Sequence, residues 1–526
     1  HEWQAGGVGR AGARLISRDE AGRPNYGGTP DDAGIVALIQ ECAARGISVT
    51  MSPFLLMDIP AGNGQADPYG GAEQAAFPWR GRITATEDKS AITRAEVEAL
   101  FGTAVAADFS ITNGSVVYSG PAEWSYRRFV LHAASLCALA GGVERFLLGS
   151  EFVSLTRLRD DAGAYPAIEA LKSLAAEVRS IVGAGVQISY AADWTEYGAY
   201  APADGSGDVL FPLDDLWADT HIDFIGLDWY APLSDWRDGD HLDADSWLRL
   251  HDMAYLSANI EGGEGYDWYY ASDADRDAQL RTPIADTAHG EDWIYRAKDI
   301  RNWWQSAHYE RPAGTRSLTA TAYQPEAKPI RLIEIGCGAV DKGTNAPNVF
   351  YDPKSSESGL PHYSDGTRDD EIQRLAIMVL SEYWGASSAQ NPHSSVYSGP
   401  MIADGGLSIW AYDARPFPAF PQLTDVWSDG ANWARGHWLN GRITRSDLGA
   451  FIEELCNDEG VGTDVSGVEG SFHGLVLSGA STLKDALGMV AGAFAVSCRQ
   501  TEDGLSFFNT SSEATEPVSD ALFAGE

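Results

Sequence analysis

The sequence predicts an α/β protein: a (β/α)8 TIM barrel with long insertions after its strands, followed by a small α+β module. Helical segments alternate with short apolar strands, and the strands end on acidic residues at their C-terminal side. No glycine-rich nucleotide loop follows any of these strands. With 526 residues, 44% of them hydrophobic and 21% charged, the chain is globular in composition and longer than one ordinary domain.

Three segments carry apolar residues at helical spacing together with helix-end signals: 31–46, 122–142 and 165–183. The first ends at Gly46, and the third has Pro166 in its first turn, where proline is tolerated. Each predicted helix leads into an apolar strand. We therefore expect a parallel sheet with helices on its outside.

Six strands are predicted, near residues 47–55, 145–151, 186–193, 222–230, 330–336 and 406–412. The first two strands of an eight-stranded barrel are not evident. Residues 13–18 are a candidate for strand two, and strand one is expected upstream of His1. The barrel, assigned to residues 1–440, is thus expected to be incomplete or closed by pairing that the pattern does not reveal.

Three long insertions, at 58–120, 231–329 and 338–404, follow strands on the side where a barrel carries its active site. They are rich in aromatic residues, which either wall a long cleft or pack the insertions themselves. The character of the sequence changes after residue 440. Residues 441–526 predict a separate α+β module, with a helix from Leu448, a strand at 472–479 and a hairpin around Asp503–Gly504.

The formal net charge of −38 argues against binding to nucleic acid or to anionic lipid, whereas neutral glycans or a basic partner subunit are compatible. No apolar run of 18 residues occurs, so no membrane-spanning helix is predicted. The five cysteines lack the spacing of metal or redox sites. We expect neither a metal ion nor an organic cofactor.

Two predicted strands end in similar acidic motifs, LLGSE with Glu151 and LIEIG with Glu334. Parallel barrel strands bring such residues together across the mouth of the barrel. Paired carboxylates carry out glycoside hydrolysis, in which one donates a proton to the leaving oxygen and the other attacks the anomeric carbon. Repulsion between them separates their pKa values and assigns the roles. The alternative for each glutamate is a cap or a salt bridge.

These strands resemble those of clan A glycoside hydrolases, with FLLGSE as strand four, RLIEIG as strand seven and LSIWAYD as strand eight. The resemblance implies that Glu151 is the acid/base and that Glu334 is the nucleophile of a retaining enzyme. It also implies that the ring of Trp410 forms the floor of a sugar-binding subsite.

The same resemblance implies further contacts near the substrate. Trp229 or Tyr230 would stack on sugar faces, and Asp228 would help to hold the nucleophile. Ser150 stands where the clan usually has an asparagine that binds the sugar 2-hydroxyl. This departure favours a barrel that has lost catalytic activity.

An ordered series of motifs covers about residues 1–440: YGGTPDD, SPFLLMDIP, PWRGRIT, LLGSEF, IGLDWYAPLSDW, IEIGCGAVDKG and WAYDARPFPAFP. The series resembles the TIM-barrel-like domain of the large baseplate protein of gene transfer agents and related tailed phages. The segment STLKDALGMVAGAFAVSCRQTEDGLSFF resembles a hub-type module of phage tail-tip proteins.

The resemblance implies a homotrimeric component of a virion-like tail that is extracellular and reaches the periplasm of the target cell. Its partners would be other tail and baseplate proteins, and its substrate would be peptidoglycan or another cell-envelope polysaccharide. Two alternatives remain. The barrel is an inactive structural or receptor-binding part of the tail tip, or the chain is a free-standing secreted glycosidase with an accessory module.

Overall fold

A computed structural model describes residues 3–9, 30–427, 429–442, 446–472, 482–502 and 504–510. The chain divides into two compact units, His1–Asn440 and Gly441–Glu526. No helix in these described stretches is both long enough and apolar enough to cross a bilayer.

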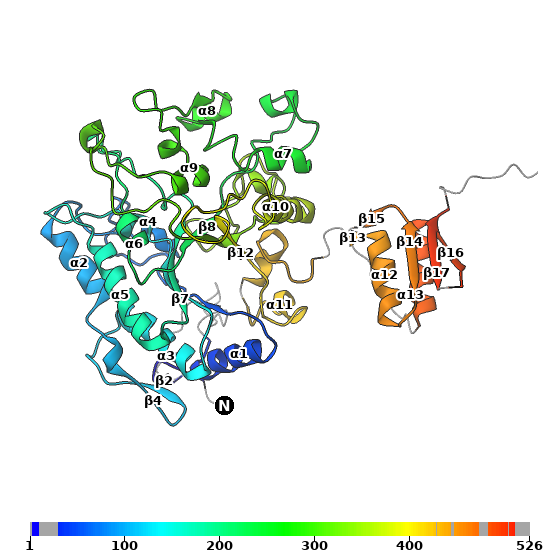
Figure 1. Cartoon of the computed structure of the whole chain (residues 1–526), viewed down its shortest axis with the longest axis horizontal. Helices are drawn as coiled ribbons and strands as arrows, with labels where there is room; N and C mark the ends of the chain where they lie inside the picture. Colours follow the sequence, from blue (N-terminus) through cyan, green and yellow to red (C-terminus); the bar gives the residue numbers. More distant parts are fainter. Residues whose placement is uncertain are drawn as a thin grey trace, which may run out of the picture. The chain divides into compact units, whose positions relative to one another are not determined.

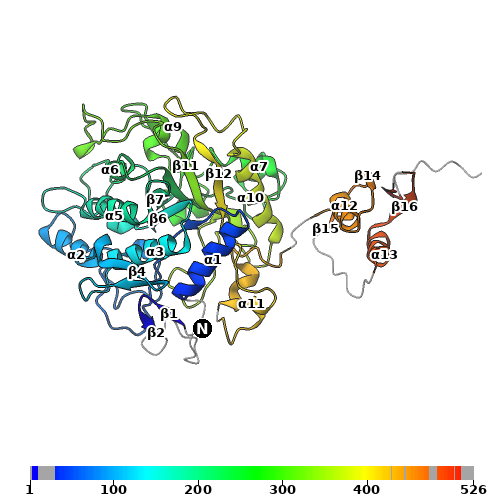
Figure 2. The same cartoon turned by 60° about the horizontal axis from the view of Figure 1, so that its bottom comes forward.

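The first unit is built on a six-stranded parallel sheet with the order β12–β11–β8–β7–β6–β3, which curls into a half-barrel (Figures 1 and 2). Its strands are β3 (Thr50–Met51), β6 (Arg145–Ser150), β7 (Gln187–Asp193), β8 (Ile225–Trp229), β11 (Ile330–Ile335) and β12 (Ile402–Ile409). Every neighbouring pair is parallel. The six predicted strands and the α/β class are therefore confirmed.

The expected closed eight-stranded barrel is not confirmed. Within the described residues, β12 and β3 are the two edges of the sheet and do not pair with each other. β3 is short because Pro53, two residues beyond it, has no N–H group to donate to a ladder. The candidate for strand two, residues 13–18, lies outside the described residues.

The three predicted helices are observed as α1 (Asp32–Ala44), α3 (Tyr126–Ala140) and α5 (Pro166–Val182). Asp31 caps α1 by accepting a hydrogen bond from Gly34 N, and Ser125 caps α3 through Arg128 N. Pro166 opens α5, as predicted. Figures 1 and 2 show α3 and α5 side by side along the sheet.

The insertions contain short elements of their own. The first holds α2 (Ala91–Phe101) and the hairpin β4 (Phe109–Thr112) and β5 (Ser115–Tyr118). The second holds α7 (Met253–Ala258), β9 (Trp268–Tyr269), α8 (Asp273–Asp277), β10 (Thr282–Pro283) and α9 (Ile300–Gln305). The third holds α10 (Asp370–Tyr383). Other short elements are β1 (Gln4–Ala5), β2 (Val8–Gly9), α4 (Val153–Thr156), α6 (Asp214–Trp217) and α11 (Ala419–Gln422).

Both faces of the sheet are buried, as expected for parallel strands. The face toward the helices joins the main apolar core, with Phe146, Ile188 and Leu227. The face inside the curl forms a smaller cluster of Leu147, Ala191 and Phe224. β7 and β8 approach closely at Gly226, where an added Cβ atom would lie 2.5 Å from the carbonyl oxygen of Tyr190. Asp228 is two residues beyond Gly226 and shares its face.

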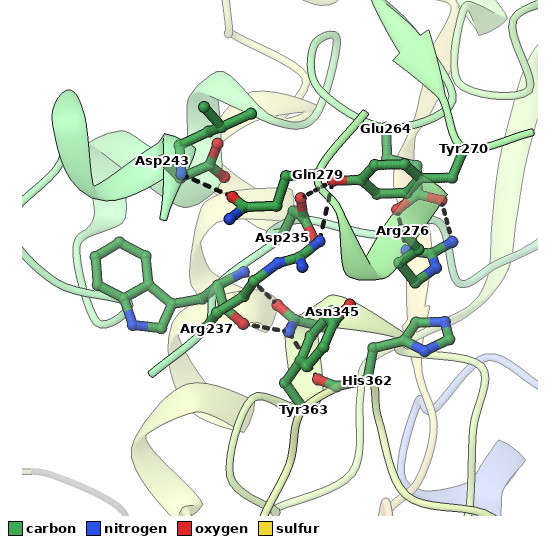
Figure 3. Close-up of polar contacts among 12 residues, drawn as sticks. Asp235, Arg237, Asp243, Glu264, Tyr270, Arg276, Gln279, Asn345, His362 and Tyr363 are labelled. Atoms are coloured by element: carbon green, nitrogen blue, oxygen red, sulfur yellow. Dashed lines mark hydrogen bonds and ion pairs between the residues drawn. The ribbon is translucent and has the colours of Figure 1, made fainter. Parts of the chain in front are cut away.

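A polar network joins the second and third insertions (Figure 3). Asp235 accepts hydrogen bonds from Tyr270 (2.6 Å) and Arg281 (2.9 Å). Arg237 lies over the ring of Tyr363, with the guanidinium carbon 4.3 Å from the ring centroid. These contacts fix the loop layer above the C-terminal ends of the strands.

The second unit is an α+β module with α12 (Leu448–Asp458) and α13 (Leu483–Phe494). Its strands are β13 (Ser446–Asp447), β14 (Thr463–Gly467), β15 (Ser471–Phe472), β16 (Val496–Gln500) and β17 (Leu505–Asn509). β16 and β17 pair antiparallel, which is the predicted hairpin, and β14 adds in parallel to β17. Most of the predicted strand at 472–479 lies outside the described residues.

Replacing Asn345 with alanine should lower the free energy of unfolding by about 2–4 kcal/mol, because several buried groups lose their partners. The Asn345 side chain accepts from Ser234 Oγ (2.6 Å) and Trp236 N (3.0 Å) and donates to the carbonyls of Trp236 and His362. Urea unfolding measures the loss. Exposed Asn348, three residues along, is the matched control and should change stability by less than about 0.5 kcal/mol.

Candidate active site

Acidic residues line the C-terminal edge of the sheet. Glu151 follows β6, Asp193 ends β7, and Asp228 and Glu334 lie near the ends of β8 and β11. The register places Asp228 between Asp193 and Glu334. One carboxylate oxygen from each of Glu151, Asp228 and Glu334 lies within 4.8 Å of the other two. The two glutamates that the sequence pairs therefore meet at one place, together with Asp228.

An irregularity in β11 aims Glu334 at this place. Leu332 pairs with Leu227 and Glu334 pairs with Asp228, so β11 has one residue more than β8 between these pairs. The extra residue is Ile333, which packs against the cluster inside the curl. A bulge of this kind re-aims the side chain that follows it. It turns Glu334 toward Asp228 although regular alternation would separate the faces of Ile333 and Glu334.

Glu151 is held by two side chains from the first insertion. Arg80 Nη2 forms a salt bridge with Glu151 Oε2 at 2.7 Å, and Trp79 Nε1 donates to the same oxygen at 2.6 Å. Both Arg80 and Glu151 are buried, and Arg80 lies over the ring of Phe54 at 3.9 Å. Glu151 has a φ of 54°, a strained backbone conformation that is concentrated at functional sites. Charge-assisted bonds of this length stabilise the ionised carboxylate.

Ser150 does not face a sugar-sized space. Its hydroxyl and its carbonyl oxygen both accept hydrogen bonds from Arg80 Nε, at 3.1 and 3.0 Å, and its side chain is buried. A substrate contact of Ser150 stays a prediction, and in this structure the Ser150 hydroxyl is already hydrogen-bonded to Arg80.

Glu334 accepts a hydrogen bond from the Tyr230 hydroxyl at 2.7 Å. Burial, followed by the negative charge of Glu151, raises the pKa of Glu334 to about 7. Tyr230 is itself buried, so it positions Glu334 and does not offer a ring face to a sugar. The expected stacking role of Tyr230 is replaced by this hydrogen bond.

Asp228 is fully buried, and within the described part of the chain neither of its carboxylate oxygens has a hydrogen-bond partner. Burial, then the charges of Glu334 and Glu151, raise the pKa of Asp228 well above its usual value. Burial and the charge of Glu151 also raise the pKa of Asp193 to about 6, although Thr195 hydrogen-bonds its carboxylate. The raised pKa values favour the protonated form of Asp228 and Glu334, whereas the expected role of Glu334 as nucleophile needs its ionised form.

Two tryptophans that the sequence places at the substrate differ in exposure. Trp410 is 41% exposed and stacks on Phe54, with ring centroids 5.8 Å apart and planes at 18°. Trp229 is 1% exposed and packs in the main core beside Tyr197. The expectation that Trp229 stacks on a sugar is therefore wrong, because alternation along β8 turns it away from the face of Asp228.

A cavity of about 700 Å³ lies beyond the ends of β7 and β8, where Trp194 and Pro232 are among the residues that line it. Glu264, Tyr269 and Asp286 also line it. Its mixed apolar and acidic wall comes largely from the second insertion. The insertion therefore borders a cleft, which is one of the two alternatives that the sequence leaves open.

The sequence does not reveal the contacts of Arg80, Trp79 and the buried Glu196. Glu196 accepts hydrogen bonds from Thr156 Oγ1 (2.6 Å) and Tyr190 OH (2.9 Å), and burial raises its pKa to about 7. The motif PWRGRIT contains Trp79 and Arg80 but has no spacing that reveals Glu151 as their partner. Only the path of the insertion brings them together.

A family model for the GTA TIM-barrel-like domain matches residues 124–421. The chain belongs to this family. The match covers β6 to β12 and all four acidic residues, and it confirms the part of the resemblance that concerns the barrel. Membership indicates a component of a gene transfer agent. The match does not extend to the C-terminal unit, whose hub role stays a prediction. A search among curated proteins found no match.

Glu196→Gln should make the stability of this GTA TIM-barrel-like chain less dependent on pH. Because the folded pKa is raised from 4.5 to about 7, the wild-type carboxyl is most favourable below pH 4.5 and loses stability as the pH rises through 7. The wild type should therefore lose about 3 kcal/mol relative to the glutamine variant between pH 4.5 and 8. Urea unfolding across this range tests it. Glu382→Gln, at an exposed position, is the control. The prediction is contradicted if the difference in stability between the wild type and Glu196→Gln depends on pH as little as the difference between the wild type and Glu382→Gln.

Proposed function

We propose that the chain is a tail baseplate component of a gene transfer agent or phage-like particle whose barrel acts on cell-envelope glycan as a retaining glycoside hydrolase. The proposal rests chiefly on the approach of Glu151 and Glu334, whose nearest oxygens lie within 4.8 Å. This value is closer to the carboxyl separation of about 5–5.5 Å in retaining enzymes than to about 6.5–9.5 Å in inverting enzymes.

In this proposal Glu334, oriented by Tyr230, attacks the anomeric carbon, and Glu151 protonates the departing oxygen and then activates water. A carboxylate in a salt bridge is a poor proton donor. Arg80 must therefore move away from Glu151, and substrate binding is the event that would displace it. Glycan would approach along Trp410 and the half-exposed Tyr269 at the cavity wall.

One observation favours a second candidate, a glycan-binding barrel without catalysis. Trp79 and Arg80 both bind the carboxylate of Glu151, and Arg80 also donates a hydrogen bond to the hydroxyl of Ser150. If this arrangement persists with glycan bound, the barrel recognises the envelope and does not cut it. Both candidate functions predict that the barrel binds glycan, but only the first predicts that it hydrolyses glycan.

Glu334→Gln should reduce glycan hydrolysis by at least about 10⁴-fold, and Glu151→Gln by about 10²–10⁴-fold, because the first removes the nucleophile and the second the proton donor. Release of reducing ends from purified sacculi and envelope polysaccharide measures turnover. Glu357→Gln removes a carboxylate that pairs with Arg82 and is the control. Wild-type turnover by Glu334→Gln would contradict the assignment, and no turnover by the wild type would favour the binding barrel.

Added azide separates the roles of the two glutamates on any aryl glycoside that the wild type cleaves. Rescue of Glu151→Gln should give a glycosyl azide of retained configuration, because azide replaces water on the glycosyl-enzyme. Rescue of Glu334→Gln should give the inverted product, because azide then replaces the carboxylate nucleophile. If Glu151→Gln gives the inverted azide and Glu334→Gln the retained one, the roles of the two glutamates are exchanged. The raised pKa of Glu334 is the reason to test this alternative.

Trp410→Ala should weaken binding of envelope glycan about tenfold or more, because an exposed ring beside the carboxylates is lost. Pull-down with insoluble sacculi measures binding under both candidate functions. Trp124 is more exposed than Trp410 and lies just before α3, so Trp124→Ala is the matched control. Equal losses in both variants would show that general surface hydrophobicity, and not this platform, causes binding.

The tail role and the hub role of residues 441–526 are proposals that rest on membership in the GTA family and on the resemblance of the C-terminal segment. They imply a homotrimer that contacts other tail proteins. Mass photometry of the purified chain and immunogold labelling of particles at the tail tip test this. A monomer absent from particles would favour the free-standing glycosidase.

A further inference from the structure

We propose that Glu151, Asp228 and Glu334 form a binding site for one divalent cation that prefers oxygen ligands, such as Mn²⁺ or Ca²⁺. One oxygen from each residue lies within 4.8 Å of the other two. The inference concerns binding alone and does not depend on glycan hydrolysis. It uses the same carboxylates for a second purpose.

The charges at this place do not balance within the protein. Glu151, Asp228 and Glu334 contribute three negative charges when ionised, and the buried Arg80 contributes one positive charge through Glu151. Buried charges are costly unless they are paired. Two further positive charges are needed, and they come either from two protons or from one divalent cation.

Asp228 is the residue that points to a ligand. It is fully buried among the strands, faces Glu334 across the ladder, and has no hydrogen-bond partner on either oxygen in the described residues. Structural carboxylates at such depth normally accept several hydrogen bonds. A cation ligand explains both the burial and the absence of a protein partner.

The protein partners of the glutamates leave oxygen atoms for a cation. Trp79 and Arg80 both bind Oε2 of Glu151, and Tyr230 binds Oε2 of Glu334. Oε1 of each glutamate has no such partner among the contacts of the described residues.

The spacing of the ligands fits a hard cation. Two oxygens bound to one Ca²⁺ at about 2.4 Å lie at most about 4.8 Å apart. All the ligand atoms are carboxylate oxygens, which suit Mn²⁺ and Ca²⁺ and do not suit zinc or copper sites, where histidine or cysteine is usual. Asp193 stands next in the row, but its Oδ1 is taken by Thr195.

Mn²⁺ titration of the full chain, stripped with EDTA and exchanged into chelator-free buffer at pH 7.5, tests the proposal by the EPR signal of free Mn²⁺. We expect one ion per wild-type chain at micromolar concentration, displaced by excess Ca²⁺. Asp228→Asn and Glu334→Gln should each weaken this binding at least tenfold. Asp273→Asn, an exposed acid on α8, is the control for the acidic surface and should bind as the wild type does.

Thermal melting of the same proteins keeps the test independent of folding defects. Mn²⁺ should raise the Tm of the wild type and of Asp273→Asn but leave that of Asp228→Asn unchanged. Without cation, Asp228→Asn should melt at or above the wild-type Tm, because it removes an unpaired buried carboxyl group. Absence of stoichiometric binding by the wild type would overturn the proposal in favour of two protons. Unchanged binding by a folded Asp228→Asn would overturn it by placing the ion elsewhere.

Discussion

Three carboxylates crowd around one guanidinium at the C-terminal edge of the sheet, and the properties of the site follow from this imbalance of charge. Arg80 neutralises Glu151 directly, so the uncompensated charge falls on Asp228 and Glu334. Burial raises the pKa of both groups, and the negative charge of Glu151 raises each of them further. A proton, a cation or a substrate that carries a developing positive charge all relieve the same imbalance. The oxocarbenium-like transition state of glycoside hydrolysis is such a species.

The parallel sheet creates this crowding. Parallel register brings the C-terminal ends of β6, β7, β8 and β11 to one edge, so residues far apart in sequence become neighbours. The apolar cluster inside the curl lies on the same strands as the acids, and β7 and β8 approach closely at Gly226. Above the acids, Asn345 ties the third insertion to the second by donating to the carbonyl oxygen of Trp236.

Much of this architecture follows from the sequence because the signals are local. Apolar runs and helix caps predict the strands and helices, and the endings LLGSE and LIEIG predict that Glu151 and Glu334 share an edge. The sequence places Trp229 at the end of a strand but does not indicate that it is buried, since exposure depends on which face of β8 it takes. Glu334 faces Asp228 only because of the bulge after Leu332, and no residue in LIEIG predicts a bulge there.

The partners of Glu151 could not be predicted for a different reason. Arg80 and Trp79 lie about 70 residues before it, in an insertion whose path is set by tertiary packing and not by periodicity. A pattern of apolar residues predicts an element but does not predict where a long loop returns. The closure of the barrel is of the same kind, since it depends on pairing between distant edges.

The contact between Arg80 and Glu151 joins a loop to a strand end, and this division has a consequence for the site. The scaffold that presents the acids is built from buried strands, in which most substitutions damage folding. The side chains that restrain Glu151 belong to an insertion and not to a strand of the sheet. Under the proposed function, a change at Trp79 or Arg80 would release Glu151 while the strands that carry the acids stay the same.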